Sequence, residues 1–205
     1  MEKPISLAVL ISGTGSTLKN LWISRQRIPA EILLVINSKA GSLGAEWARN
    51  QNIPVKEIIR KEYSHFEAFS HAITHELDRV KPELIILAGF IHHYQIPPHY
   101  KNQVMNIHPS LIPAFCGKGF YGEKVHQAVL DRGVQYSGCT VHFADNDYDQ
   151  GPIILQRVVE VTPEDTIQTL STRVFLAECE AYPQAIQWFQ QKKLKIQGNR
   201  VLKNL

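Results

Sequence analysis

Short apolar runs alternate with helix-like segments along roughly the first 130 of the 205 residues, and this alternation constrains the fold most strongly. The run Leu84–Leu87 holds no polar residue, which is typical of a strand buried on both faces of a parallel sheet. Two more β-like segments follow at 138–143 and 153–161. This order predicts an α/β fold: a Rossmann-like, doubly wound, mostly parallel sheet with an antiparallel β segment near the C-terminal part. The expected parallel strands are 7–11, 32–36, 55–59, 84–87 and 104–107.

Residues that favour helix N-termini predict where several helices begin. Ser42 is expected to cap a short helix, and Ser64 and Glu67 have the spacing of a capping box. Thr162 precedes a proline and two acidic residues, which predicts the start of the closing helix. Pro183 lies within that helix, where we expect a kink or a break.

The charge is unevenly distributed along the chain. Lys and Arg number 22 and Asp and Glu number 19, for a net charge of +3. Residues 191–205 hold five basic residues and no acidic one, so residues 1–190 carry 17 basic against 19 acidic residues. The basic segment 191–205 also resembles a small hairpin. A basic tail on a slightly acidic body argues against nucleic acid as a partner.

Length and composition indicate one globular domain, 1–205, with a first half at 1–105, a second half at 106–190 and the basic tail. No apolar stretch approaches about 18 residues, so we expect no membrane partner. The three cysteines form no CxxC pair, which predicts a reducing, cytoplasmic location.

The loop Gly13–Thr17 joins the first expected strand to the first expected helix. Its glycines let the backbone approach an anion, and the helix start adds free N–H groups. Leu18 occupies the third glycine position of GxGxxG, and Asn37 stands where a dinucleotide site needs an acid. The loop therefore favours a monophosphate; the alternative is a tight turn without a ligand.

Asn106 and His108 end the last parallel strand and lie two residues apart, so their side chains point the same way. Histidine exchanges protons near neutral pH, and the asparagine amide can donate to a developing oxyanion. This pattern predicts proton-transfer chemistry at a sheet edge, with a purely structural histidine as the alternative.

Three acidic residues alternate in the loop after residue 143: Asp145, Asp147 and Asp149. Calcium is disfavoured because Gln150 follows the third acid where a calcium loop has glycine. We expect instead that one acid reaches a histidine, orients its ring and raises its pKa. The histidines around His92 lack the spacing of a ligand set, so no metal is expected.

Together, five strings occurring in order resemble the phosphoribosylglycinamide formyltransferases, folate-dependent enzymes of purine synthesis, over essentially the whole length. The strings are Ser-Gly-Thr-Gly-Ser at 12–16, Leu-Ala-Gly-Phe at 87–90, Asn-Ile-His-Pro-Ser-Leu-Ile-Pro at 106–113, Thr-Val-His-Phe at 140–143 and Asp-Gln-Gly-Pro-Ile-Ile at 149–154.

The resemblance implies the chemistry and the site residues. It implies that the chain transfers the formyl group of 10-formyltetrahydrofolate, a co-substrate, to the amine of glycinamide ribonucleotide, with no metal. The implied catalytic residues are Asn106, His108 and Asp149. The implied substrate-binding residues are Gly15, Ser16, Thr17 and Glu178, with the first three at the phosphate. The implied folate-binding residues are Ile91, His92, His93, Tyr94, Asn106, Asp145, Asp147 and Tyr148.

The chain departs from the family pattern in four places. Thr17 stands where asparagine is usual, and Phe66 where an arginine meets the folate tail. The pair His92-His93 replaces an arginine-containing stretch, and the loop 116–124 is longer. Lys118 or Lys124 of that loop is a candidate for the missing positive charge.

Two other functions remain open at this level. A formyltetrahydrofolate hydrolase would use the same trio with water as acceptor, although an added regulatory domain is usual there. A phosphate-binding regulatory module would keep the glycine-rich loop without turnover. A methionyl-tRNA formyltransferase is not expected, because 205 residues leave no room for its RNA-binding domain. The expected partners are therefore small molecules, and the expected assembly is a monomer or homodimer.

Overall fold

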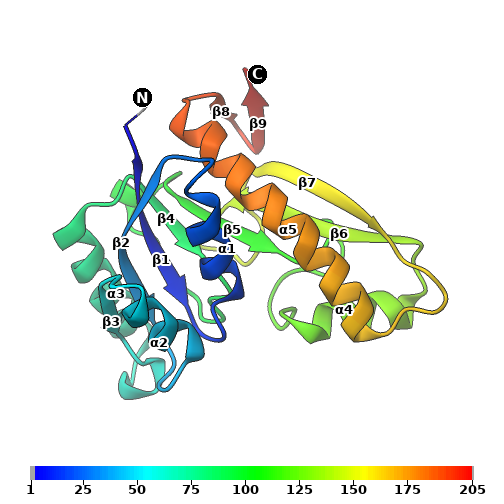
Figure 1. Cartoon of the computed structure of the whole chain (residues 1–205), viewed down its shortest axis with the longest axis horizontal. Coiled ribbons are helices and arrows are strands. Elements are labelled where there is room, and N and C mark those ends of the chain that lie inside the picture. Colours follow the sequence, from blue (N-terminus) through cyan, green and yellow to red (C-terminus); the bar gives the residue numbers. More distant parts are fainter. Residues whose placement is uncertain (1–2, 205) are drawn as a thin grey trace. The chain divides into compact units, whose positions relative to one another are not determined.

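The computed structural model describes residues 3–204, which fall into two compact units divided between Met105 and Asn106. Figure 1 labels the helices and strands. The strand β5 (Val104–His108) crosses this boundary. The other elements of the first unit are β1 (Ile5–Ile11), α1 (Ser16–Ser24), β2 (Ala30–Asn37), α2 (Leu43–Asn50), β3 (Val55–Glu57), η1 (Arg60–Glu62), α3 (Phe66–Val80), β4 (Leu84–Leu87) and η2 (Pro98–Tyr100).

The sheet of the first unit is parallel, in the order β3-β2-β1-β4. Its central strand β1 is almost wholly buried, which requires cover on both faces. Helix α2 packs against β2 and β3, and α3 packs against β2. The alternation of strands and helices therefore forms the expected doubly wound, parallel arrangement, in which ligands bind beyond the carboxyl ends of the strands.

One of the two cap predictions in this unit is right. The Ser42 hydroxyl accepts a hydrogen bond from the Ala45 N–H at 3.2 Å, as expected of the α2 N-cap. The capping box at Ser64 and Glu67 is wrong, because α3 has His65 at its N-cap, without a side-chain cap. Burial of the apolar face of α3 outweighs one cap of about 1 kcal/mol, so packing decides where this helix begins.

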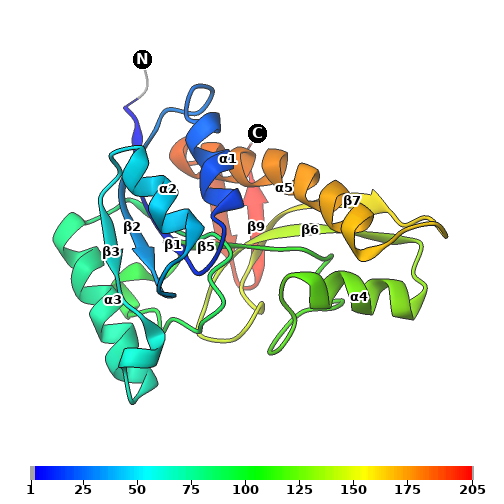
Figure 2. The same ribbon diagram turned by 60° about the horizontal axis from the view of Figure 1, so that its bottom comes forward.

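The second unit contains the antiparallel part of the sheet. Its elements are α4 (Glu123–Arg132), β6 (Tyr136–Phe143), β7 (Ile153–Glu160), α5 (Ile167–Gln190), β8 (Leu194–Gln197) and β9 (Arg200–Lys203). Strands β6 and β7 pair antiparallel, while β9 meets β7 in parallel at one position. Helix α5 packs on β6, β7 and α4, as Figure 2 shows from a second side. The sequence thus predicts both the mostly parallel sheet and its antiparallel segment.

The C-terminal elements depart from expectation at two points. Helix α5 begins at Ile167 with Thr166 as its N-cap, not at Thr162. The Asp165 carboxylate accepts from the Thr162 N–H at 2.8 Å and pairs with Arg173, which folds the preceding segment into a turn. Of the two outcomes expected at Pro183, a kink or a break, the break does not occur, because the helix continues through this buried proline to Gln190.

The hairpin expected in the basic tail is present as β8 and β9. Gly198 turns between them with a φ of +58°. Within residues 3–204, no helix combines the length and apolar character needed to span a membrane.

Candidate active site

The loop between β1 and α1 is shaped by a close approach of two backbones. Gly15 has a φ of +73°, and a Cβ atom built on it would lie 2.7 Å from the Gly44 Cα. The Gly44 N–H donates to the Gly13 carbonyl at 3.0 Å, which ties the loop to the start of α2. Thr14 and Ser16 are exposed and their hydroxyls lie 3.1 Å apart, beside the first N–H groups of α1. A glycine-lined helix start with exposed hydroxyls can bind a phosphate.

Asn37 stands where a dinucleotide site would carry its acid, and it is fully buried. Its Nδ2 donates to the Lys39 carbonyl at 2.7 Å, and its Oδ1 accepts from the Ser42 hydroxyl at 2.9 Å. Both ends of the amide therefore hold the β2–α2 connection. This internal role leaves no acceptor for a ribose, which agrees with the exclusion of a dinucleotide.

The segment 91–94 follows β4 in the first unit, and its residues have different surroundings. Ile91 is 47% exposed, and its N–H donates to the Ser12 hydroxyl at 3.1 Å. Tyr94 is buried, with its hydroxyl 3.0 Å from that of Thr74, and burial raises the pKa of Tyr94 to about 12. The Tyr94 side chain thus belongs to the core of the unit, while Ile91 faces outward.

The two histidines of this segment pack on aromatic rings. His92 lies edge-on to Phe69 at 5.7 Å between ring centroids, and burial together with the charge of Arg60 lowers the pKa of His92. His93 packs against Phe66 at 4.9 Å. Phe66, at the position of the absent arginine, is therefore a ring-packing residue beside this segment.

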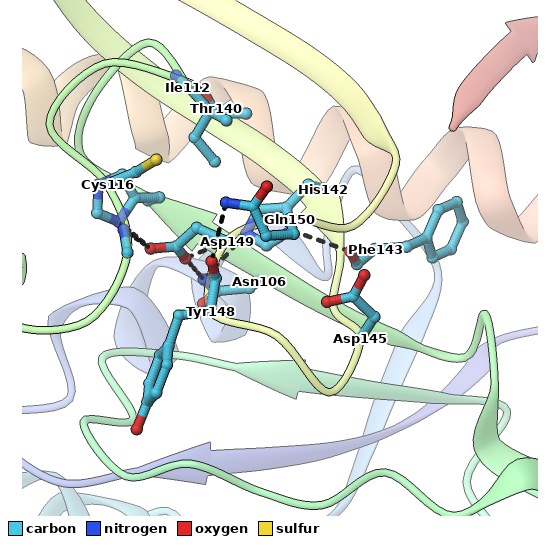
Figure 3. Close-up of polar contacts among 12 residues, drawn as sticks. Asn106, Ile112, Cys116, Thr140, His142, Phe143, Asp145, Tyr148, Asp149 and Gln150 are labelled. Carbon is cyan, nitrogen blue, oxygen red and sulfur yellow. Dashed lines mark hydrogen bonds and ion pairs between the residues drawn. The ribbon is translucent and has the colours of Figure 1, made fainter. Parts of the chain in front are cut away.

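In the second unit, four polar side chains from three segments converge, and Figure 3 labels three of them, Asn106, His142 and Asp149. Asn106 and His108 come from β5, His142 from β6, and Asp149 from the loop after β6. The Asn106 Nδ2 lies 3.2 Å from the His142 Nε2 and 3.4 Å from the Asp149 Oδ1. The His108 Nδ1 lies 3.6 Å from the Asp149 Oδ2. The structure thus brings Asn106, His108 and Asp149 into one cluster and adds His142.

His108 is a buried imidazole with one nitrogen already engaged. Its Nε2–H donates to the Phe115 carbonyl at 2.8 Å, which leaves Nδ1 facing Asp149. Burial lowers the pKa of His108, and this outweighs the opposite effects of the Asp149 charge and the Phe115 hydrogen bond. Asp149 thus has the expected raising effect on the pKa of His108, but burial reverses the net direction. At neutral pH the ring is uncharged and can accept a proton at Nδ1.

Asp149 has a φ of +57°, a left-handed conformation that aspartate tolerates better than most residues. Its Oδ2 accepts from the Gly117 N–H at 2.8 Å. Burial raises the pKa of Asp149, but three neighbours together lower it by more: the nearby His142 ring, the charge of His108 and the hydrogen bond from Gly117. The net shift is therefore downward. The carboxylate is thus anionic at neutral pH.

The remaining acids of this loop lie at the surface. Asp145 and Asp147 are exposed and form a turn in which the Asp147 N–H donates to Asp145 Oδ1 at 3.1 Å. Tyr148 is 41% exposed, and Figure 3 shows its ring directed away from Asp149. Of the three alternating acids, Asp149 alone is held within the cluster.

The loop after His108 is fixed by contacts that the sequence did not reveal. The Thr140 hydroxyl donates to the Ser110 carbonyl at 2.7 Å and accepts from the Ile112 N–H at 3.1 Å. Gln156 Nε2 donates to both the Ile112 carbonyl and the Thr140 hydroxyl at 3.0 Å. Thr140 and His142 lie two apart on a strand that is buried from Ser137 to Phe143. That spacing is the signal from which both could have been found.

Glu178, on α5, is partly buried, and no hydrogen bond or ion pair to its carboxylate is found within residues 3–204. Burial raises the pKa of Glu178 to about 7. Its charge also contributes to a raised pKa at Cys139. Within residues 3–204, no group of three or more His, Cys, Asp or Glu side chains is placed to hold a metal ion.

Comparison with known proteins defines the class. Residues 5–186 match the family model of the formyl transferases, so the chain belongs to the formyl transferase family. Among solved structures, it is similar to glycinamide ribonucleotide transformylase 1 from Symbiobacterium toebii. The identity is 36%, the TM-score is 0.90, and the match covers 98% of this chain and 94% of the other. A phosphoribosylglycinamide formyltransferase from Coxiella burnetii has 33% identity, a TM-score of 0.90 and the same coverage.

Curated relatives are often much longer. The trifunctional purine biosynthetic protein adenosine-3 of Bos taurus is 43% identical over 190 residues. The match covers 90% of this chain but 18% of that protein. The chain thus spans less than a fifth of the first curated relatives it matches.

Proposed function

We propose that the chain transfers the formyl group of 10-formyltetrahydrofolate to the amine of 5-phosphoribosylglycinamide, a step of purine biosynthesis. The observation that carries this proposal is the cluster of Asn106, His108 and Asp149, in which an amide, an uncharged imidazole and a carboxylate meet. The names of the similar solved structures support the ribonucleotide acceptor and the transfer of a formyl group.

In the proposed reaction, the substrate amine is the nucleophile, so the protein needs no covalent one. A carbon–nitrogen bond forms to the formyl carbon, and its bond to the folate nitrogen breaks. Asn106 donates an N–H to the oxyanion of the tetrahedral intermediate. His108 accepts the amine proton at Nδ1 and returns it to the leaving folate nitrogen, while Asp149 stabilises the transient imidazolium.

The ligand contacts are proposals as well. Gly15, Ser16 and Thr17 bind the phosphate of the ribonucleotide, which the exposed helix start supports. Glu178, whose carboxylate has no hydrogen-bond or ion-pair partner among the described residues, contacts the glycinamide substrate. The residues proposed to line the folate pocket are Ile91, His92, His93, Tyr94, Asn106, Asp145, Asp147 and Tyr148. Because its side chain packs on Thr74, Tyr94 would contribute its backbone.

The organisation and setting of the protein complete the proposal. The two compact units act as one formyltransferase domain. The partners are the two small-molecule substrates, with neither nucleic acid nor membrane, in a cytoplasmic monomer or homodimer.

A formyl-transfer assay with both substrates tests the proposal. The His108→Ala variant should lose about 100-fold or more in turnover, whereas His71→Ala, at an exposed position of α3, should not. Formate release without the ribonucleotide would indicate a formyltetrahydrofolate hydrolase instead. Phosphate binding without any turnover would indicate a regulatory module.

A further inference from the structure

His142 is a buried polar residue beside the trio, and its ring is held in one orientation. The side chain is 1% exposed. Its Nδ1–H donates to the Phe143 carbonyl at 2.9 Å, as Figure 3 shows. With the ring proton on Nδ1, Nε2 is left as a hydrogen-bond acceptor.

Asn106 points its amide at two acceptors. Its Nδ2 carries two hydrogens, of which one is directed to His142 Nε2 at 3.2 Å and the other to Asp149 Oδ1 at 3.4 Å. A 180° turn of the amide would place its oxygen against a ring lone pair and a carboxylate at once. These two acceptors therefore select one orientation of the Asn106 amide.

The two hydrogen bonds differ in what surrounds them. Asp149 already accepts from Gly117 at 2.8 Å and faces His108, so it has other partners when the longer Asn106 contact opens. The His142 Nε2 lies 3.6 Å from Asp149, beyond hydrogen-bond distance. Within residues 3–204, Asn106 is the only donor to this nitrogen. The contact to His142 is thus the one that can persist during a reaction.

We propose that His142 is a positioning residue that orients the Asn106 amide for the formyl group. The inference rests on the proposed function. One Nδ2 hydrogen of Asn106 stays hydrogen-bonded to His142. The second Nδ2 hydrogen leaves Asp149 and donates to the oxyanion as negative charge develops there. His142 itself does not touch the substrate.

Two substitutions separate this role from simple packing. His142→Phe keeps a planar ring, somewhat larger than imidazole, but removes the acceptor. The value of kcat should fall about 10-fold or more, a part of the 10²–10³ that one oxyanion donor supplies. KM for both substrates should stay within about two-fold, because ground-state binding does not depend on this contact. His142→Gln returns an acceptor oxygen and should recover most of the lost kcat. Equal losses in the two variants would overturn the proposal.

A double-substitution cycle tests whether His142 acts through Asn106. In the Asn106→Ala background, His142→Phe should change kcat by less than about two-fold, because the group it orients is gone. A full 10-fold loss in that background would show an independent role and refute the inference. Thermal unfolding of each variant confirms that the compared proteins are folded, and His71→Phe provides an exposed control.

An activity-independent measurement keeps the two proposals apart. The side-chain amide signals of Asn106, identified by their loss in Asn106→Ala, should be protected from hydrogen exchange in the wild type and in His142→Gln. They should exchange faster in His142→Phe. If these signals behave so while formyl transfer is absent, the proposed function fails and the positioning contact stands. Unchanged exchange in His142→Phe would overturn the positioning role itself.

Discussion

Replacing Gly15 by alanine tests whether the β1–α1 loop requires glycine for the reason the structure indicates. The new Cβ would lie 2.7 Å from the Gly44 Cα, and this neighbour is backbone that cannot rotate away. The φ of +73° adds a left-handed cost of about 1–2 kcal/mol for a residue with a Cβ. Overpacking against a fixed neighbour adds about 1–3 kcal/mol, and the lower entropy of the unfolded alanine chain offsets about 0.4–1 kcal/mol.

These contributions predict a net loss of about 1–5 kcal/mol for Gly15→Ala. At about 3 °C per kcal/mol for a chain of this size, the midpoint of thermal unfolding should fall by about 3–15 °C. Gly13→Ala is the matched control, because a Cβ there meets nothing within 4 Å and the φ is not left-handed.

The assay is thermal unfolding by circular dichroism, with urea unfolding to confirm the free-energy difference. Equal stability of the Gly15→Ala and Gly13→Ala variants would refute the close-packing argument. A phosphate-binding titration of Gly13→Ala, in which the added Cβ makes no close contact, then tests the loop's proposed ligand separately from its packing.

Three further predictions concern charged groups. Because the Asp149 charge raises the pKa of His108 against the larger effect of burial, Asp149→Asn should lower that pKa further in an NMR titration; a rise would contradict the electrostatic account. Glu178 has a pKa raised to about 7, so its ionisation opposes folding when the pH rises above the ordinary glutamate pKa of 4.5. Glu178→Gln should therefore stabilise the protein by about 1–3 kcal/mol at neutral pH and should have no effect at low pH, as measured by urea unfolding. Asp165 has its pKa lowered mainly by its hydrogen bond with Arg173, so its contribution to stability is present above the ordinary aspartate pKa of 3.8 and is lost as the pH falls. In urea unfolding at neutral pH, Asp165→Asn should cost about 1–3 kcal/mol, whereas the control Glu164→Gln, at an exposed neighbouring position, should cost little.

Helix boundaries show where local sequence signals are sufficient. Ser42 caps α2 as predicted, since nothing else competes for the start of that short helix. Thr162 does not cap α5, because Asp165 pairs with Arg173 eight residues further along and turns the chain first. The residues around a helix N-cap do not reveal a contact with a side chain eight positions further along the chain.

The candidate cluster was predictable in part. Asn106 and His108 share a face because residues two apart in a strand point the same way. Asp149 carries the expected contact between a loop acid and a histidine. His142 was not assigned a role, because its importance depends on which atom of Asn106 it meets across the sheet.

The sequence by itself determined the order of strands and helices, the glycine-rich loop and the shared face of Asn106 and His108. These follow from hydrophobic periodicity and local geometry, which act between residues near in the chain. The tertiary structure alone decided that His108 has a lowered pKa, that Asn37 faces inward and that the Asn106 amide has a single orientation. Each of these depends on burial and on partners distant in sequence, and their opposing contributions can be compared only when the chain is folded.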